Sequence, residues 1–232
     1  MIVVSLFVNP TQFAPGEDLA AYPKDFERDC ALAGAEGVDV MFAPEAGEMY
    51  AEDHATFINV DRITGNLCGA SRPGHFRGVA TVVAKLFHIC GPQRAYFGLK
   101  DYQQVRVIET MIRDLNFPVE LVRCPIVREP DGVAMSSRNS YLSADERRAA
   151  TILRRSLVAA GKRIEQGERD GAAITRQLRE AIETEPLASV DYAEVVDAES
   201  LVPLDRIESA ALLAVAVRIG RARLIDNLVV EA

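Results

Sequence analysis

The order of apolar and polar positions along the chain first predicts strands that alternate with helices. The chain opens on the continuous apolar, β-branched run MIVVSLFV, which is typical of a strand buried on both faces of a parallel sheet. Helical apolar spacing and Gly or Pro stops predict helices at residues 24–36, 75–90 and 102–115, and strands at VDVMFAP, AYFGL and VELVRCP. This alternation predicts a right-handed, mostly parallel α/β sheet, which binds ligands beyond the carboxyl ends of its strands.

The pattern changes beyond about residue 127. Two amphipathic helices are predicted at residues 143–165 and 171–183, and three short strands follow at residues 190–196, 210–218 and 223–230. Helices followed by consecutive strands suggest a smaller α+β domain. The sequence therefore predicts two domains, a mostly parallel α/β-sheet domain over residues 1–126 and a smaller α+β domain over residues 127–232.

Composition limits the classes of partner and the compartment. The chain has 26 Lys and Arg against 34 Asp and Glu, and its net charge of −8 argues against a broad surface for nucleic acid or anionic membrane. No apolar run approaches the roughly 20 residues of a membrane span, and no signal-peptide pattern precedes the apolar start. The four cysteines lack CxxC spacing, which favours reduced, mostly buried thiols over disulfides or metal ligands. We therefore expect a cytoplasmic protein.

Two polar segments, FGLKDYQQ and AMSSRNSYL, carry the strongest candidate chemistry. In each, a short apolar or small-residue run leads to a turn, and a cation and several hydrogen-bonding side chains follow. Lysine and arginine neutralise phosphate oxygens, hydroxyl groups donate to them, and an aspartate beside the lysine can hold the magnesium that accompanies a nucleotide. The segments predict a polyphosphate site made of Lys100, Asp101, Gln103 and Gln104 in the first and Ser136, Ser137, Arg138 and Asn139 in the second.

Two other loops could bind a small anion. Asn9 and Gln12 follow the first predicted strand, where neutral amides could orient a hydroxylated, carboxylated small molecule. Arg72, His75 and Arg77 lie at the start of a predicted helix, whose unpaired backbone amides favour an anion. These loops extend the candidate site beyond the phosphate-binding segments.

Plain structural interpretations compete with each functional one. Asn9 could serve ordinary turn chemistry, and His75 could be a helix cap or a packed side chain. Asp101 could cap the next helix with Lys100 in solvent, and the serine-rich segment could be an interdomain turn. The conjunction of three polar loops at strand ends or at the domain boundary favours function. No Walker A motif, GxGxxG after a strand, GxSxG elbow or HExxH motif is present in the sequence.

Long blocks of the sequence resemble one enzyme family. In chain order they are SLFVNPTQF, EDLAAYPKDFERDC, SRPGHFRGVATVVAKLF, FGLKDYQQ, DGVAMSSRNSYL and ARLIDN. Together they are similar to the pantothenate synthetases, also called pantoate–beta-alanine ligases, over essentially the whole chain. The resemblance implies the fold of the nucleotidylyltransferase superfamily. A Rossmann-like parallel-sheet domain without the family's first strand would bind nucleotide and pantoate over residues 1–126, and an α+β lid domain would span residues 127–232.

The resemblance also implies the reaction and its partners. The family condenses pantoate with beta-alanine, using ATP and Mg²⁺, through a pantoyl-adenylate intermediate. AMP and pyrophosphate are released. We accordingly expect pantoate, beta-alanine and ATP as ligands, a homodimer, and neither nucleic acid nor membrane as a partner.

The resemblance assigns pantoate-binding roles to four residues. Gln12 and Gln104 would contact the hydroxyl groups and the carboxylate of pantoate, with Asn9 and Tyr22 beside the second half of the site. Arg72 and His75 lie in a matching block, but the resemblance gives them no clear role.

The ATP-binding residues come from the two polar segments and the chain between them. Lys100, Ser136, Ser137 and Arg138 would hold the phosphates and act in catalysis. Asp101 would approach the magnesium ion. The adenosine pocket would be lined by Gly98, Val127 and Met135.

Two departures from the family leave three hypotheses open. The family normally begins with a further strand and a loop with PTMG and HxGH segments, whose histidines contact ATP, and it usually has a polar residue in place of Leu99. The chain could be an active ligase whose start lies upstream of Met1. It could be a catalytically weak form that binds nucleotide or pantoate or serves structurally. It could be another adenylylating enzyme, but the amides of NPTQF and DYQQ favour pantoate.

Overall fold

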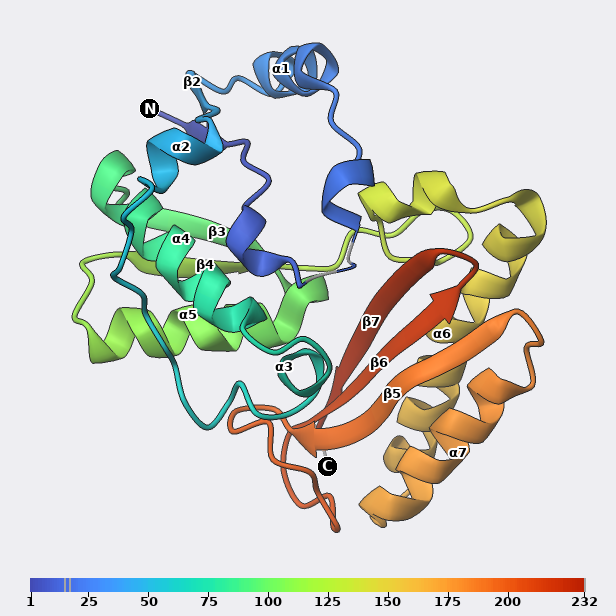
Figure 1. Cartoon of the computed structure of the whole chain (residues 1–232). Helices are drawn as coiled ribbons and strands as arrows, with labels where there is room; N and C mark the ends of the chain where they lie inside the picture. Colours follow the sequence, from blue (N-terminus) through green and yellow to red (C-terminus); the bar gives the residue numbers. More distant parts are fainter. Residues whose placement is uncertain (15, 17, 232) are drawn as a thin grey trace. The chain divides into compact units, whose positions relative to one another are not determined.

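The computed structural model describes residues 1–14, 16 and 18–231, so Glu17, the first residue of the EDLAAYPKDFERDC block, lies outside the described residues (Figure 1). Two compact units are present, and each is built from segments that are distant in the sequence. One unit comprises Met1–Val60, Arg72–Ala95 and Val107–Leu121, and the other Asp61–Ser71, Tyr96–Arg106 and Val122–Ala232. The two contiguous domains expected from the sequence stay a prediction.

The first unit opens with a strand–helix–strand segment. Strand β1 (Val3–Ser5) pairs in parallel with β2 (Val40–Phe42), and α1 (Phe26–Ala35) connects them with Asp25 as its N-cap. This confirms the predicted strand–helix–strand order. The expected burial on both faces is wrong, because Ile2 is 54% exposed and β1 itself is half-exposed. With three residues and one paired neighbour among the described residues, β1 has too little cover to be buried.

Helix α4 (His75–Cys90) has the bounds predicted from its apolar spacing. Gly74 and Gly91 flank it in left-handed conformations, with φ of 83° and 52°, which glycine adopts without strain. The 3₁₀ turn η1 (Pro10–Gln12) lies against α4 at Gly78, where an added Cβ would lie 2.4 Å from the carbonyl oxygen of Thr11. The absence of a side chain at Gly78 thus permits the close approach of the NPTQF loop to α4.

The next strand–helix–strand segment carries FGLKDYQQ. Strands β3 (Arg94–Gly98) and β4 (Glu120–Cys124) form a two-stranded sheet, and α5 (Tyr102–Asp114) connects them after the 3₁₀ turn η3 (Leu99–Asp101). The division between the units runs through β3, α5 and β4. Short helices that the sequence pattern did not predict are η2 (Asp18–Ala21), α2 (Ala46–Met49) and α3 (Cys68–Ser71). The α/β fold class is as predicted.

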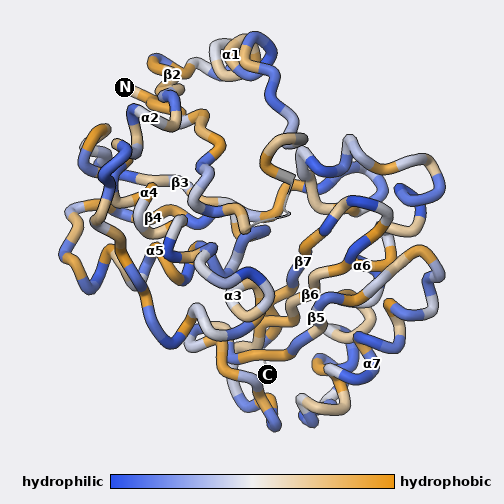
Figure 2. Tube along the Cα trace, in the orientation of Figure 1, coloured by the Kyte–Doolittle hydropathy of each residue, from blue (hydrophilic) through white to orange (hydrophobic). Residues whose placement is uncertain are grey.

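The second unit contains an antiparallel sheet in the order β5-β6-β7, made of Ala188–Asp197, Ala211–Ile219 and Ala222–Val230. Figure 1 shows α6 (Ala144–Glu165) and α7 (Gly171–Glu183) along one face of this sheet. Alternate residues of β6 face two separate apolar clusters: Leu213 packs with the two helices, and Leu212 packs with Tyr102 and Leu201. The residues of β6 from Ala211 to Val217 are accordingly all buried, and Figure 2 shows hydrophobic colouring along β6.

The cysteines differ from the sequence-based expectation. All four are free thiols, but only Cys68 is buried, and Cys30, Cys90 and Cys124 are partly exposed. The prediction of mostly buried thiols is therefore wrong, because three of them lie on half-covered elements. Among the described residues, no helix is both long enough and apolar enough to span a membrane.

Candidate active site

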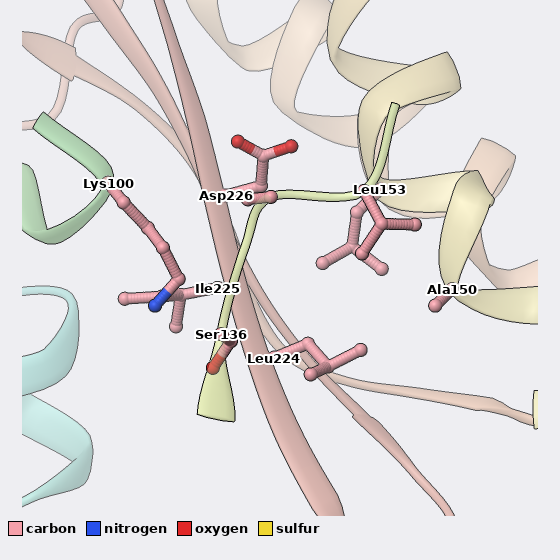
Figure 3. Close-up of a pocket in the computed structure, with 9 residues that line it drawn as sticks. Lys100, Ser136, Ala150, Leu153, Leu224, Ile225 and Asp226 are labelled. Atoms are coloured by element: carbon pink, nitrogen blue, oxygen red, sulfur yellow. The ribbon is translucent and has the colours of Figure 1, made fainter. Parts of the chain in front are cut away.

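Lys100 lies in a small pocket of the second unit. Its side chain is 22% exposed, so the alternative that places it in solvent is wrong. The pocket is lined by Lys100, Val133, Ala134, Ser136, Ala150, Leu153, Leu224, Ile225 and Asp226. Figure 3 shows the lysine extending from its turn toward Ile225 on β7, with Ser136 close by. The structure therefore brings the two predicted phosphate-binding segments to one pocket.

The turn that carries Lys100 is anchored on several sides. The phenol of Tyr102 donates to the carbonyl oxygen of Ala198 over 3.0 Å. The buried amide of Gln103 donates to Ile63 and Asn66 carbonyls over 2.9 and 2.8 Å and accepts from the Cys68 amide over 3.0 Å. Gln103 thus acts structurally, whereas Gln104 is half-buried on the same helix.

Asp101 keeps an accessible carboxylate beside this turn. Its side chain is 48% exposed, and its Oδ2 lies 3.9 Å from the Lys100 ammonium nitrogen. Mg²⁺ typically binds one or two carboxylates together with substrate phosphates and water. The Asp101 carboxylate therefore fits the predicted metal-binding role.

A hairpin delivers the second polar segment. The amide of Met135 donates to the carbonyl of Val127 over 2.9 Å, and Gly132 turns the chain with φ of 89°. Val127 and Met135 are 61% and 55% exposed, so both predicted adenosine contacts present apolar surface. The 3₁₀ turn η4 (Ser137–Tyr141) follows, and its N-cap Ser136 accepts from the Arg138 amide over 3.3 Å.

Ionic contacts hold the hairpin to α6. The guanidinium of Arg147 binds Asp131 over 2.7 Å and Glu129 over 2.9 Å, and its hydrogen bond lowers the pKa of the Asp131 carboxyl. The amide of Asn139 in η4 donates to Glu129 over 2.6 Å and to the carbonyl of Ala134 over 3.1 Å. These contacts hold the hairpin and η4 to the start of α6.

Two adjacent residues of β7 contact the Lys100 turn and the base of the hairpin that leads to Ser136. Asp226, 2% exposed, accepts from both terminal nitrogens of Arg128 over 2.7 and 2.9 Å. Asn227, 6% exposed, donates to the carbonyl oxygens of Leu99 and Lys100 over 2.9 Å each. Sequence reasoning quoted ARLIDN only as a family block and gave these two residues no role. The available signal was a pair of adjacent polar residues between the apolar residues Leu224–Ile225 and Leu228–Val230 of the strand.

Asn9 in the first unit is a buried turn residue. Its side-chain oxygen accepts from the amide and the hydroxyl of Thr11 over 3.3 and 3.0 Å, and its nitrogen donates to the carbonyl of Gly78 over 3.2 Å. These contacts bear out the alternative of turn chemistry. The role of Asn9 beside pantoate stays a prediction.

Gln12 lies close to the charged start of α4. Arg72 donates to the Gln12 carbonyl over 3.1 Å, and Nδ1 of His75 lies 3.0 Å from the same oxygen. Nε2 of His75 lies 3.1 Å from Arg72 Nη1, so a neutral imidazole with its proton on Nδ1 satisfies both contacts. Tyr22 packs edge-on against Phe13, with ring centroids 6.1 Å apart. The first unit thus gathers Gln12, Arg72 and His75 into one cluster.

Comparison with known proteins defines the family. The protein-family model for pantoate-beta-alanine ligase matches residues 1–229 of the chain. The chain therefore belongs to the pantoate-beta-alanine ligase family, as the motif resemblance predicted.

Curated relatives match along the whole chain. A pantothenate synthetase of Roseiflexus castenholzii is 57% identical over 231 residues, which is 100% of this chain and 83% of the relative. A pantothenate synthetase of Acetivibrio thermocellus is 56% identical over 99% of this chain and 82% of the relative.

Solved structures share the fold. The crystal structure of pantothenate synthetase from Thermus thermophilus has a TM-score of 0.93 and 52% identity, covering 97% of this chain and 82% of that chain. A pantoate-beta-alanine ligase of Francisella tularensis, complexed with beta-gamma ATP and beta-alanine, has a TM-score of 0.76 and 31% identity over 97% of this chain and 78% of its own.

Proposed function

We propose that this chain is an ATP-dependent, AMP-forming ligase that joins pantoate to beta-alanine. One structural observation carries the proposal alongside family membership: Lys100 and Ser136, from two predicted phosphate-binding segments, line the same pocket. A lysine and a hydroxyl group in a partly apolar pocket suit a phosphate, because desolvation strengthens charge-assisted hydrogen bonds. The matches to ligases over 99–100% of this chain do not favour the hypothesis of a catalytically weak form.

The first step forms pantoyl adenylate. A carboxylate oxygen of pantoate attacks the α-phosphorus of ATP in line, and the bond to the bridging oxygen of pyrophosphate breaks. Lys100 and Arg138 stabilise the charge that develops on the phosphates and on the leaving pyrophosphate, and the hydroxyl groups of Ser136 and Ser137 donate to phosphate oxygens. Asp101 would hold Mg²⁺, which neutralises phosphate charge when bound with ATP.

The second step transfers the acyl group. The amine of beta-alanine attacks the acyl carbon of pantoyl adenylate, the bond to the AMP oxygen breaks, and the amine loses a proton. AMP and pantothenate are the products. No protein nucleophile is needed in either step, because the adenylate already supplies a good leaving group.

The remaining assignments concern the adenosine and pantoate sites, the oligomeric state and the cellular location. Val127, Met135 and Gly98 would line the adenosine pocket, and Gln12, Gln104, Asn9 and Tyr22 would serve the pantoate site. Exposed apolar side chains at Val127 and Met135 support the first assignment. The proposal also includes a homodimer and a cytoplasmic location.

Replacement of Gln104 by alanine should raise the KM for pantoate roughly tenfold, since a lost hydrogen bond to a charged carboxylate costs about 1.5 kcal/mol. The KM for ATP should change little. Initial rates of pantoate-dependent AMP formation at varied substrate concentrations measure both constants. The matched variant Gln103→Ala should instead lower the thermal midpoint, because Gln103 holds backbone groups of residues 63–68. A raised ATP KM with an unchanged pantoate KM for Gln104→Ala would contradict the assignment.

A further inference from the structure

We propose that Asp226 and Asn227 are positioning residues that fix the two phosphate-binding segments relative to one strand. Asn227 would set the backbone that carries Lys100, and Asp226 would set the hairpin that leads to Ser136. The inference deepens the proposed function and rests on it.

The Asn227 contact is specific to an amide donor. A side-chain amide nitrogen has two protons, and here two carbonyl oxygens, those of Leu99 and Lys100, accept from it over 2.9 Å each. Both carbonyls belong to η3, the turn between β3 and α5. Two bonds to successive peptide groups fix the orientation of the turn, and therefore the direction in which Lys100 leaves it. Because Asn227 is only 6% exposed, water cannot easily replace its side-chain amide as a donor.

The Asp226 contact holds the hairpin that precedes the other segment. Its carboxylate accepts from Arg128 through both terminal nitrogens, and Arg128 Nη1 also donates to the carbonyl of Gly132 over 3.0 Å. Arg128 thereby ties the base of the hairpin to its turn, and the hairpin leads directly into Ser136. The same carboxylate accepts from the backbone N–H of Asn227 over 2.8 Å, which fixes its orientation beside that residue.

Strand geometry explains why two adjacent residues can serve two segments. Successive side chains on a strand point to opposite faces. Asp226 and Asn227 can therefore contact different residues although their Cα atoms are only about 3.8 Å apart. β7 is itself held along its length by β6, with Asp226 opposite Val215 and Asn227 opposite Ala214. The positions of Lys100 and Ser136 are therefore both fixed relative to strand β7. A displacement of about 1 Å at a reacting group can cost a hundredfold in rate.

The test is the pantoate-dependent exchange of labelled pyrophosphate into ATP, which reports adenylate formation alone. Asn227→Leu removes both donors and keeps an uncharged side chain of similar size. We expect its exchange kcat to fall at least tenfold, up to about a hundredfold, with the pantoate KM within about twofold of the parent value. The control Thr81→Val removes a buried hydroxyl group that donates to the Arg77 carbonyl over 2.7 Å in the first unit, and its kcat per folded molecule should match the parent.

A double-mutant cycle separates positioning from general destabilisation. If Asn227 acts through Lys100, adding Asn227→Leu to Lys100→Ala should lower the exchange rate by less than about threefold. If Asn227→Leu does not fold, Asn227→Ser, which keeps one hydroxyl donor, takes its place in the double-mutant cycle with Lys100→Ala. If Asn227→Leu lowered the exchange rate by the same factor in the parent and in Lys100→Ala, or did not lower it in the parent, the inference would be wrong. The proposed function would still stand. Absence of pantoate-dependent exchange in the parent would overturn the proposed function, and the inference with it.

Discussion

Replacement of Lys100 by alanine should slow pantoate-dependent AMP formation about a hundredfold, or roughly 3 kcal/mol in activation free energy. The ammonium group lies in a pocket with 22% of its side chain exposed, where its charge is less screened than on an open surface. The loss should appear in kcat more than in substrate KM, because phosphate charge develops mainly in the transition state. Quenched-flow or steady-state measurement of AMP and pyrophosphate gives the rate.

The matched control for this prediction is Lys162→Ala. Lys162 lies exposed near the end of α6, so its removal makes the same change in net charge away from the pocket. Its rate should stay within about twofold of the parent, as expected for a solvated surface charge. Equal pyrophosphate release by Lys100→Ala and the parent would show that Lys100 does not stabilise the transition state.

The largest stability loss is expected for Arg128→Met, about 3 kcal/mol or more in the free energy of unfolding. This variant leaves the carboxylate of Asp226, 2% exposed, without its cationic partner, and an unpaired buried charge is costly. Urea unfolding followed by circular dichroism gives the free energy. The exposed pair of Arg94 and Glu120 is the control, and Arg94→Met should cost less than about 1 kcal/mol.

A second variant separates loss of the ion pair from loss of packing. Arg128→Met combined with Asp226→Leu removes both charges, so most of the lost stability should return. If the double variant were as unstable as Arg128→Met alone, the loss would come from packing and the unpaired-charge explanation would be wrong. If Arg128→Met unfolded at the same urea concentration as the parent, the Arg128–Asp226 pair would not stabilise this fold.

Much of the fold could be predicted because local rules and tertiary packing agree. Helix α4 follows from apolar residues at helical spacing between two glycines that adopt positive φ. Helix α6 begins at the capping box of Ser143 and Glu146, and its predicted end at residue 165 matches the structure. The alternation of strands with helices, followed by consecutive strands, gave the fold class. These features depend on residues within a few positions of one another.

The site could be predicted only in part. The clusters of polar residues in FGLKDYQQ and AMSSRNSYL identified Lys100 and Ser136, which the structure brings to one pocket. Nothing local distinguishes Gln103, which binds backbone groups, from Gln104 beside it. Arg128, Leu99 and Lys100, which bond to Asp226 and Asn227, lie 98 to 128 positions away in the sequence, so a local pattern cannot reveal these contacts. The assignments of individual residues to pantoate and ATP stay predictions.

The most direct test of the account follows oxygen from pantoate to AMP. Pantoate labelled with ¹⁸O in its carboxylate is incubated with the protein, ATP, Mg²⁺ and beta-alanine, and the AMP is analysed by mass spectrometry. The account predicts one ¹⁸O atom in each AMP formed, because a carboxylate oxygen bonds to the α-phosphorus and leaves with AMP when the amine attacks the acyl carbon. Unlabelled AMP, or ADP as the nucleotide product, would contradict ligation through pantoyl adenylate.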